Sequence, residues 1–244
     1  MASEKIIFFD LGSNGPKNRA WSYNPWKTRF VLNYKGLDYE TKWLEYPEIK
    51  PTIKPHIPVA EDDHYTIPAV KFPDGTYMME SFDIATRIEK EHPEPPLHLD
   101  APIFDRLRPL TMGGQSAIRP IVMTQVYKRL LKESNWEYWK KTRFASIDMP
   151  IEQYEKEFAS DDTPYKNAAP HFSKISELLH EDESGPFFMG KTVCYTDFVW
   201  GSVLLFYRRI GEDVFEKVLE ATGDRDVHLK LLEGLKPWSE RDDH

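Results

Sequence analysis

The sequence predicts an α+β protein in two parts: four strands with two helices, then an all-helical half. Short apolar runs separated by turn residues recur only before residue 81. The proline-rich run PEPPLHLDAP follows soon after and is typical of a linker. Beyond it, apolar residues recur at helical spacing. We therefore expect domains at 1–93 and 104–244, joined by a linker at 94–103.

The first elements are expected in the order strand, helix, strand. KIIFFDL at 5–11 has the length and apolar content of a buried strand. Pro25 suits the first turn of a helix, where its missing N–H is not needed, so Asn24 is expected as the N-cap and Gly36 as the C-terminal cap. A second strand is expected at 38–46.

The rest of the first domain is expected to be a loop, a hairpin and a helix. The loop is centred on the Pro- and Lys-rich run IKPTIKPHIP. TIPAVKF and TYMME flank a Pro-Asp-Gly turn and predict the hairpin, which completes a mixed four-stranded sheet. SFDIATRIEKEH predicts the helix, with Ser81 as its cap.

The second domain is expected to contain helices only. The acidic run GDRDV and the tail ERDDH are expected to be solvated surface. The expected helices lie at about 104–132, 135–145, 150–158, 166–182, 196–210 and 212–222.

Composition excludes several classes of function. The formal net charge of −8 argues against a nucleic-acid binder or a polybasic membrane-surface protein. No apolar stretch is long enough to cross a bilayer, and the N-terminal MASEKIIFFD has no signal-peptide core. A single cysteine, Cys194, rules out a disulfide within the chain and favours the reducing cytoplasm. The eight histidines show no metal-ligand spacing, so no metal site is expected.

Ser22 is the first candidate for chemistry, because it stands just before the helix that Asn24 and Pro25 begin. The N–H groups and dipole of a helix N-terminus stabilise an anion. A hydroxyl at that place could add a hydrogen bond and lower the pKa of a ligand's thiol. Taken alone, the stretch is better explained by a solvated serine and an ordinary cap.

Two further pairs could bind an extended ligand. A cis bond between Ile67 and Pro68 would turn the backbone of Ile67 outward to pair with a peptide-like ligand. Ser81 with the helix N-terminus could bind a carboxylate, and Glu80 could accept from an ammonium group. Each pair also has a structural explanation, a trans proline opening a strand and a plain helix cap.

The order of these features resembles the cytosolic glutathione transferases over essentially the whole chain. Those proteins join a thioredoxin-like domain to an all-helical domain, and carry a Ser, Cys or Tyr near the first helix, an apolar residue before cis-proline, and a Glu/Gln-Ser pair. Ser22 precedes Lys27 by five positions, as in the serine and cysteine classes. The pattern S-x-x-x-W-K-T and the segment YWKKTRFASIDMPIEQY are similar to bacterial β-etherase-type transferases and a related group in wood-decay fungi.

The resemblance implies where glutathione, the co-substrate, would bind. Its thiol would lie near Ser22, the catalytic residue, and near Asn24 at the start of the first helix. Its cysteinyl backbone would pair with Ile67 beside Pro68, and its γ-glutamyl end would meet the Glu80-Ser81 pair.

Lys54 and His56 lie where relatives hold the glycyl carboxylate of glutathione. A cation there makes electrostatic sense. A solvated basic loop explains the two residues as well.

The resemblance also implies an acceptor site against the helical domain and a homodimer. Tyr23, Trp26 and Tyr127 are the expected aromatic walls for a small hydrophobic aromatic electrophile. The expected reaction is conjugation or displacement of an aryl ether, with a peroxidase-type side activity as a further possibility. The alternative is a ligandin that binds aromatic or phenolic compounds without turnover.

The family's capping box at the central helix is altered in this sequence. Cys194, expected to be buried and structural, stands three residues before Asp197, where relatives have Ser or Thr. We expect either that Thr196 substitutes for the cap or that the box is weakened.

Overall fold

The computed structural model describes residues 5–59 and 64–243, so residues 1–4 of the N-terminal stretch lie outside it. A four-stranded sheet in the order β2-β1-β3-β4 forms the first half, with β1 parallel to β2 and antiparallel to β3. The α+β prediction with a mixed sheet is confirmed. The elements are β1 (Ile6–Leu11), α1 (Tyr23–Tyr34), β2 (Tyr39–Leu44), α2 (Tyr46–Ile53), β3 (Ala69–Lys71), β4 (Tyr77–Met79) and α3 (Ser81–Glu91).

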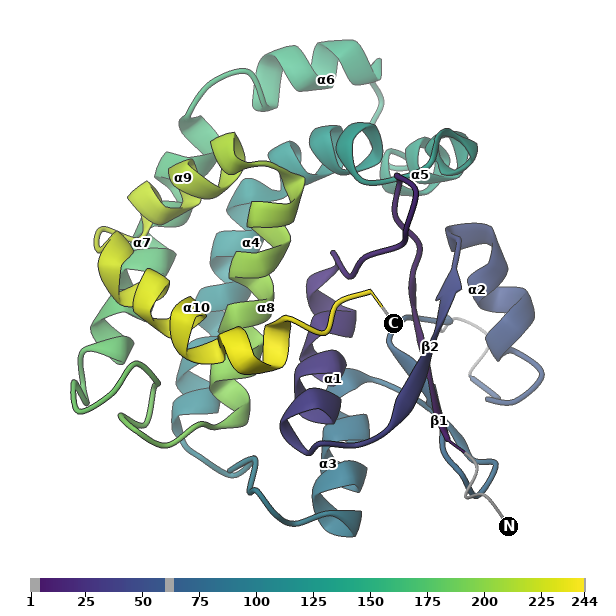
Figure 1. Cartoon of the computed structure of the whole chain (residues 1–244). Coiled ribbons are helices and arrows are strands. Elements are labelled where there is room, and N and C mark those ends of the chain that lie inside the picture. The colour runs from purple at the N-terminus through teal and green to yellow at the C-terminus, as the bar shows by residue number, and fades with distance from the viewer. Residues whose placement is uncertain (1–4, 60–63, 244) are drawn as a thin grey trace.

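The sheet separates α1 and α3 from α2, which lies on its other side (Figure 1). The prediction of a loop around IKPTIKPHIP was wrong, because its first residues complete α2. The helix forms since Pro47 lies in its first turn, where no N–H is required. Glu45 and Glu48 close a capping box, with the Glu45 N–H donating to Glu48 Oε2 over 2.8 Å.

Seven α-helices and a 3₁₀ turn make up the second half in the described part of the chain. The six predicted helices are confirmed to within a few residues at most ends. The seventh was missed. They are α4 (Ile103–Arg129), α5 (Trp136–Arg143), α6 (Ile151–Phe158), α7 (Thr163–Leu179), α8 (Tyr195–Ile210), α9 (Glu212–Ala221) and α10 (Arg225–Ser239), with the turn at Glu133–Asn135.

The acidic run GDRDV lies at the surface, as predicted, with none of its five residues buried, and it also begins α10, a helix that the sequence analysis missed. Asp224 caps the helix by accepting from the N–H groups of Asp226 and Val227. Leu231 and Leu235 bury the inner face of α10. This helix was missed in the sequence because many charged residues lie between its apolar residues.

The C-terminal tail, predicted to be solvated, is only partly so. The Arg241 guanidinium lies 3.9 Å from the centre of the Tyr39 ring and donates to the Tyr39 carbonyl over 3.0 Å. The Ala20 N–H donates to the Asp242 carbonyl over 2.8 Å. The tail therefore returns to the first half of the chain, as Figure 1 shows by the position of the C-terminus beside α1 and β2.

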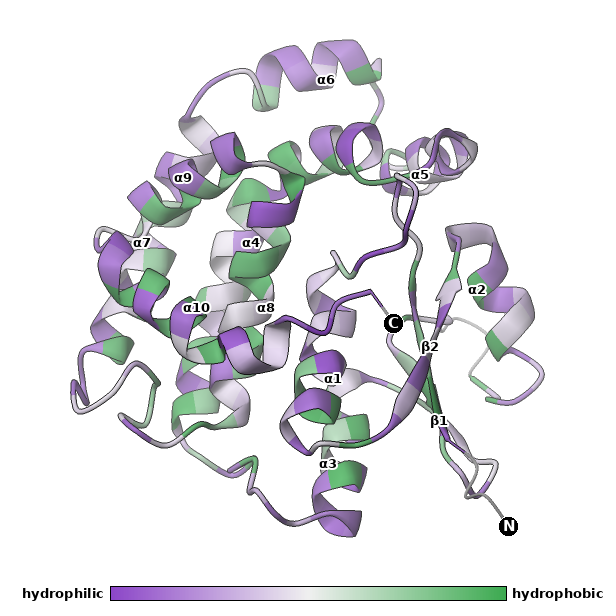
Figure 2. Ribbon diagram, viewed as in Figure 1, coloured by the Kyte–Doolittle hydropathy of each residue, from purple (hydrophilic) through white to green (hydrophobic). Residues whose placement is uncertain are grey.

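Helices α1 and α8 join the two halves. Phe30 stacks on Phe198 with ring centres 5.3 Å apart. Arg29 and Asp10, both fully buried, form an ion pair of 2.8 Å that ties α1 to β1. The outer helix α6 contrasts with this core, since it has no buried residue and is largely hydrophilic in Figure 2.

The capping box of α8 is complete despite its cysteine. Cys194 is fully buried, as predicted, and holds the N-cap position. Its N–H and that of Phe188 donate to the two carboxylate oxygens of Asp197 over 2.7 and 2.8 Å. Thr196 does not substitute, because it is the second residue of α8 and the N-cap position belongs to Cys194. Burial raises the pKa of Asp197 to about 6.

Candidate active site

Ser22 occupies the N-cap of α1, the position that we predicted for Asn24. Helix α1 begins at Tyr23, so Asn24 is its second residue and Pro25 its third. That shift is allowed because the first four N–H groups of a helix need no helical partner. Ser22 is 9 % exposed, and its hydroxyl makes no capping hydrogen bond within the described structure. The hydroxyl is therefore available to a ligand.

Lys27 links the start of α1 to the start of α3. Its ammonium group donates to Asn24 Oδ1 over 2.9 Å and lies 5.3 Å from the centre of the Tyr23 ring. Burial lowers the pKa of Lys27 to about 8, while the carboxylate of Glu80 opposes that change. This electrostatic attraction between Lys27 and Glu80 connects the Ser22 region with the Glu80-Ser81 pair.

The Ile67-Pro68 peptide bond is cis, the geometry required of the second motif. Pairing of β3 with β1 and β4 begins only at Ala69, so Ile67 precedes the ladder. The neighbouring Thr66 hydroxyl donates to Glu80 Oε1 over 3.0 Å. This bond places the cis-proline motif beside the Glu80-Ser81 pair.

Glu80, rather than Ser81, occupies the N-cap of α3. Its φ of +67° is a conformation that costs a non-glycine residue free energy and is found preferentially at functional sites. Ser81 is the first residue of the helix, and its hydroxyl is hydrogen-bonded to that of Tyr195. The structure thus assembles all three motifs around the N-termini of α1 and α3.

A cavity of about 590 Å³ opens beside Ser22, between α1 and the helical half. Six of the side chains that line it are aromatic, and its charged residues are both arginines. Its described lining comprises Trp21, Ser22, Tyr23, Asn24, Tyr46, Met112, Gln115, Ser116, Arg119, Val122, Met123, Trp139, Arg143, Phe206 and Tyr207.

Tyr23 lines this cavity as expected, whereas Trp26 and Tyr127 do not. Trp26 is 3 % exposed and packs on Phe30, one helical turn further, with ring centres 5.2 Å apart. Tyr127 is 5 % exposed and meets Trp136 edge to face at 5.5 Å. Both belong to the core, because helix rotation turns them away from the cavity.

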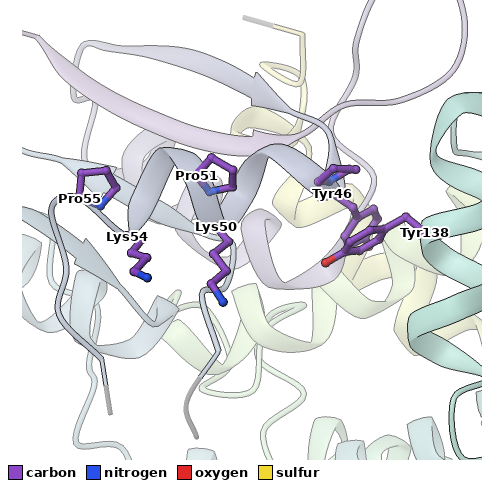
Figure 3. Close-up of a pocket in the computed structure, with 7 residues that line it drawn as sticks. Tyr46, Lys50, Pro51, Lys54, Pro55 and Tyr138 are labelled. Carbon is purple, nitrogen blue, oxygen red and sulfur yellow. The ribbon is translucent and has the colours of Figure 1, made fainter. Parts of the chain in front are cut away.

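Lys54 lines a separate cavity of about 710 Å³ between α2 and α5. Figure 3 shows Lys50 and Lys54 extending side by side from α2, with Tyr46 and Tyr138 at the other end. Tyr46 lines both cavities, so the two adjoin. His56 instead stacks on Tyr77 of β4, with ring centres 3.9 Å apart.

Sequence reasoning missed the residues that the helical half contributes to the first cavity. Arg119 on α4 and Arg143 on α5 read as ordinary surface cations. Phe206 and Tyr207 lie in the apolar run of α8 and read as core. Only the helix packing brings these segments together. Groups of three His, Cys, Asp or Glu that could hold a metal ion are absent from the part of the chain that the structure describes.

Comparison with family models decides the family. Residues 21–91 match the glutathione S-transferase N-terminal domain, and residues 110–238 match the glutathione S-transferase C-terminal domain. The second match alone covers more than half of the chain. The chain belongs to the glutathione S-transferase family. The resemblance noted from Ser22, Pro68 and the Glu80-Ser81 pair is thereby confirmed at the level of the family.

Fungal transferases are among its structural relatives. Glutathione transferase GSTFuA3 from Phanerochaete chrysosporium is 26 % identical, with a TM-score of 0.80 over 97 % of this chain and 98 % of that one. A transferase of Ceriporiopsis subvermispora, solved in complex with glutathione, is 26 % identical, with a TM-score of 0.79 over 96 % and 98 %. The glutathione S-transferase-like protein ustS of Aspergillus flavus is 25 % identical, in an alignment that covers 88 % of this chain and 84 % of that protein.

In the described ranges, no helix is both long and apolar enough to cross a membrane.

Proposed function

We propose that this protein is a serine-type glutathione transferase in which Ser22 stabilises the glutathione thiolate. The observation that carries the proposal is the place of Ser22. Its hydroxyl makes no cap bond in the described structure, stands at the N-terminus of α1 and lines the aromatic cavity. A hydroxyl and a helix N-terminus together favour the anionic form of a thiol and lower its pKa.

Glutathione is proposed to run from α3 to α1. Its γ-glutamyl end meets Glu80 and Ser81, its cysteinyl backbone pairs with Ile67 beside cis-Pro68, and its thiol reaches Ser22 and Asn24. Binding of glutathione in the Ceriporiopsis subvermispora relative supports this co-substrate. The lysine-lined cavity at Lys54 is the proposed place of the glycyl carboxylate, with no assigned role for His56 beyond its stacking on Tyr77.

The proposed reaction is nucleophilic substitution at an aromatic compound held in the 590 Å³ cavity. The thiolate sulfur forms a bond to the electrophilic carbon, and the leaving group departs with the bonding electron pair. With an aryl ether as the acceptor, a phenolate leaves and takes a proton from solvent. Ser22 donates a hydrogen bond throughout and does not act as the base.

A ligandin role is the second candidate, because six aromatic side chains line the cavity. Flat aromatic compounds would then bind there by stacking, without bond formation. The two functions differ in one measurable respect. A transferase must form glutathione thiolate near neutral pH, and a ligandin need not.

Ultraviolet difference titration of bound glutathione tests the role of Ser22. In the wild type we expect thiolate absorbance with an apparent pKa well below the value of about 8.5 for a free thiol. Ser22→Ala should return the pKa toward that value and lower turnover of an aryl halide roughly 100-fold, as for loss of one donor to a developing anion. Glutathione affinity should change little, because the tripeptide backbone is bound elsewhere.

Ser116→Ala is the matched control, since Ser116 lines the same cavity from α4. It should leave the thiolate pKa unchanged. A Ser22→Ala variant with full turnover would refute the catalytic role. Glutathione binding without thiolate in the wild type would favour the ligandin.

We also propose, on the family resemblance, a cytoplasmic homodimer with a detoxifying or phenolic-binding role. The single cysteine and the fungal relatives support this setting. β-Etherase or peroxidase-type activity belongs to the same proposal.

A further inference from the structure

The charges of the 590 Å³ cavity are all of one sign. Arg119 and Arg143 line it, and no carboxylate does so among the described lining residues. Neither arginine forms an ion pair with a described acidic residue. The whole chain has a formal net charge of −8, so a cavity lined only by cations is opposite in sign to the chain as a whole. Such a cavity attracts anions.

Arg143 is held in place by aromatic rings. Its guanidinium carbon lies 5.0 Å from the centre of the Trp139 ring and 5.6 Å from that of Tyr46, whose hydroxyl accepts a hydrogen bond from it. A cation at the C-terminus of α5 also complements the helix dipole. The helix dipole does not explain Arg119, because Arg119 lies in the interior of α4.

Two buried polar groups of the cavity lack partners. The hydroxyl of Tyr207, a residue with 0 % exposure, has no hydrogen-bond partner in the described structure, and neither does Gln115 Nε2. Burial raises the pKa of Tyr207, so its hydroxyl stays protonated and able to donate. Unpartnered buried donors are rare because they cost folding free energy, and an acceptor atom of a ligand or of an ordered water would complete these two.

Burial orders these groups by depth. Tyr207 is fully buried, Gln115 and Arg143 are partly buried, and Arg119 is exposed. We infer from this order that the cavity runs from Arg119 inward to Tyr207. Aromatic rings from α1 and α8 lie between, where Tyr23 meets Phe206 edge to face at 5.4 Å. The arrangement fits a flat ligand with an anionic group outward and a hydrogen-bond acceptor inward.

We propose that the acceptor cavity selects aromatic acids, planar compounds whose carboxylate or phenolate pairs with Arg143 and Arg119 while an inner oxygen accepts from Tyr207 and Gln115. The inference rests on the proposed function in one respect, that this cavity is the acceptor side of the glutathione site. It adds the chemical class of the acceptor, which aromatic stacking alone does not specify.

Calorimetry with three matched probes, in the absence of glutathione, tests the selection. The probes are 6-acetyl-2-naphthoate, its neutral carboxamide, and 6-isopropyl-2-naphthoate, which lacks the inner oxygen. The acetyl carboxylate should bind roughly tenfold tighter than either analogue, the effect of one charge-assisted or one well-made hydrogen bond. Equal affinities of the three probes for the wild type would overturn the proposal.

Variants then assign each preference to its residue. Arg143→Gln should abolish the preference for carboxylate over carboxamide, and Arg143→Lys should restore part of it. Lys141→Gln, an exposed neighbour on α5 outside the cavity lining, should leave it intact. An Arg143→Gln, Arg119→Gln double variant that keeps the full preference would refute the role of both arginines.

Tyr207→Phe removes only an unpartnered hydroxyl, so its melting temperature should not fall below that of the wild type. It should nonetheless lose the preference for acetyl over isopropyl. Tyr127→Phe, a buried tyrosine outside the cavity lining, is the control and should keep that preference.

These measurements need no thiolate and therefore remain separate from the test of Ser22. Selective binding with no thiolate formation would refute the transferase proposal and retain the cavity assignment. Thiolate formation without a preference among the three probes would support the transferase proposal and refute the cavity assignment.

Discussion

Arg29 places a charge in the middle of the first domain, where only a paired charge is tolerated. It donates to Asp10 Oδ2 over 2.8 Å, and its guanidinium carbon lies 4.9 Å from the centre of the Phe8 ring. Burial raises the pKa of Asp10, and the neighbouring Arg29 opposes that change. The ion pair fixes where α1 packs along β1, and it thereby fixes the position of Ser22 at the start of α1.

Arg29→Met should therefore destabilise the protein strongly. It leaves the Asp10 carboxylate buried without its cation, a change that costs about 3–5 kcal/mol. Denaturant unfolding measures this loss. Adding Asp10→Asn should recover a large part of it, because the uncompensated charge is then gone. A double variant as unstable as the single one would show that packing, rather than charge, dominates the site.

At the residue scale the sequence located the three motifs, and their roles in binding stay predictions. Three short patterns have a geometry that follows from the nearby backbone: Ser22, Ile67-Pro68 and Glu80-Ser81. The structure brings them together. The cap assignments were wrong at Asn24 and Ser81, because either of two neighbouring residues can begin a helix and packing decides between them. The catalytic role of Ser22 stays a prediction.

At the scale of elements, α10 is attached to the helical half by a buried histidine. His228 Nδ1 accepts from Trp200 Nε1 over 2.8 Å, and its Nε2 lies 2.8 Å from Ser176 Oγ. The indole can only donate, so the ring is neutral with its proton on Nε2. Ser176 in turn donates to the Thr222 carbonyl over 2.8 Å.

This chain of bonds makes stability depend on pH. Burial lowers the pKa of His228 from 6.5 to about 4. The unfolded chain therefore binds this proton more readily than the folded chain does. The contribution of His228 to the free energy of unfolding is complete above pH 6.5 and is lost as the pH falls toward 4. The loss amounts to about 3 kcal/mol. Asp197 has the opposite effect over part of this range, because burial raises its pKa to about 6. Its contribution to the free energy of unfolding increases as the pH falls.

Comparison with His228→Gln isolates the histidine, since Asp197 is common to both proteins. Unfolding free energies measured from pH 7 to pH 4 should fall less steeply in the variant. His92→Gln, which removes an exposed histidine, should follow the wild type. Parallel curves for wild type and His228→Gln would contradict the assigned cause.

At the scale of the whole molecule, Phe198 couples the two halves. It is fully buried, stacks on Phe30 of α1 and meets Tyr34 edge to face at 5.3 Å. Phe198→Ala should cost about 3–5 kcal/mol through lost burial and the cavity left behind. Phe158→Ala on α6, where the ring is 45 % exposed, should cost under about 1 kcal/mol.

Thermal unfolding followed by near- and far-ultraviolet circular dichroism measures both variants. The wild type should unfold in one transition. In Phe198→Ala we expect the two halves to separate into two transitions. A single transition at an unchanged midpoint would show that the stack does not couple them. The expected division at 1–93, 94–103 and 104–244 stays a prediction that such an experiment could refine.

The sequence by itself determined the α+β class and most helices, because periodicity and turn residues act along short stretches. It also determined the family, through the resemblance that the order of the three motifs carries. Only the tertiary structure decided the acceptor cavity. Arg119, Arg143 and Tyr207 come from three helices and meet near Ser22 through helix rotation and packing. The same reason removed Trp26 and Tyr127 from the cavity: an aromatic residue on a helix faces the core or the ligand according to an angle that the neighbouring helices set.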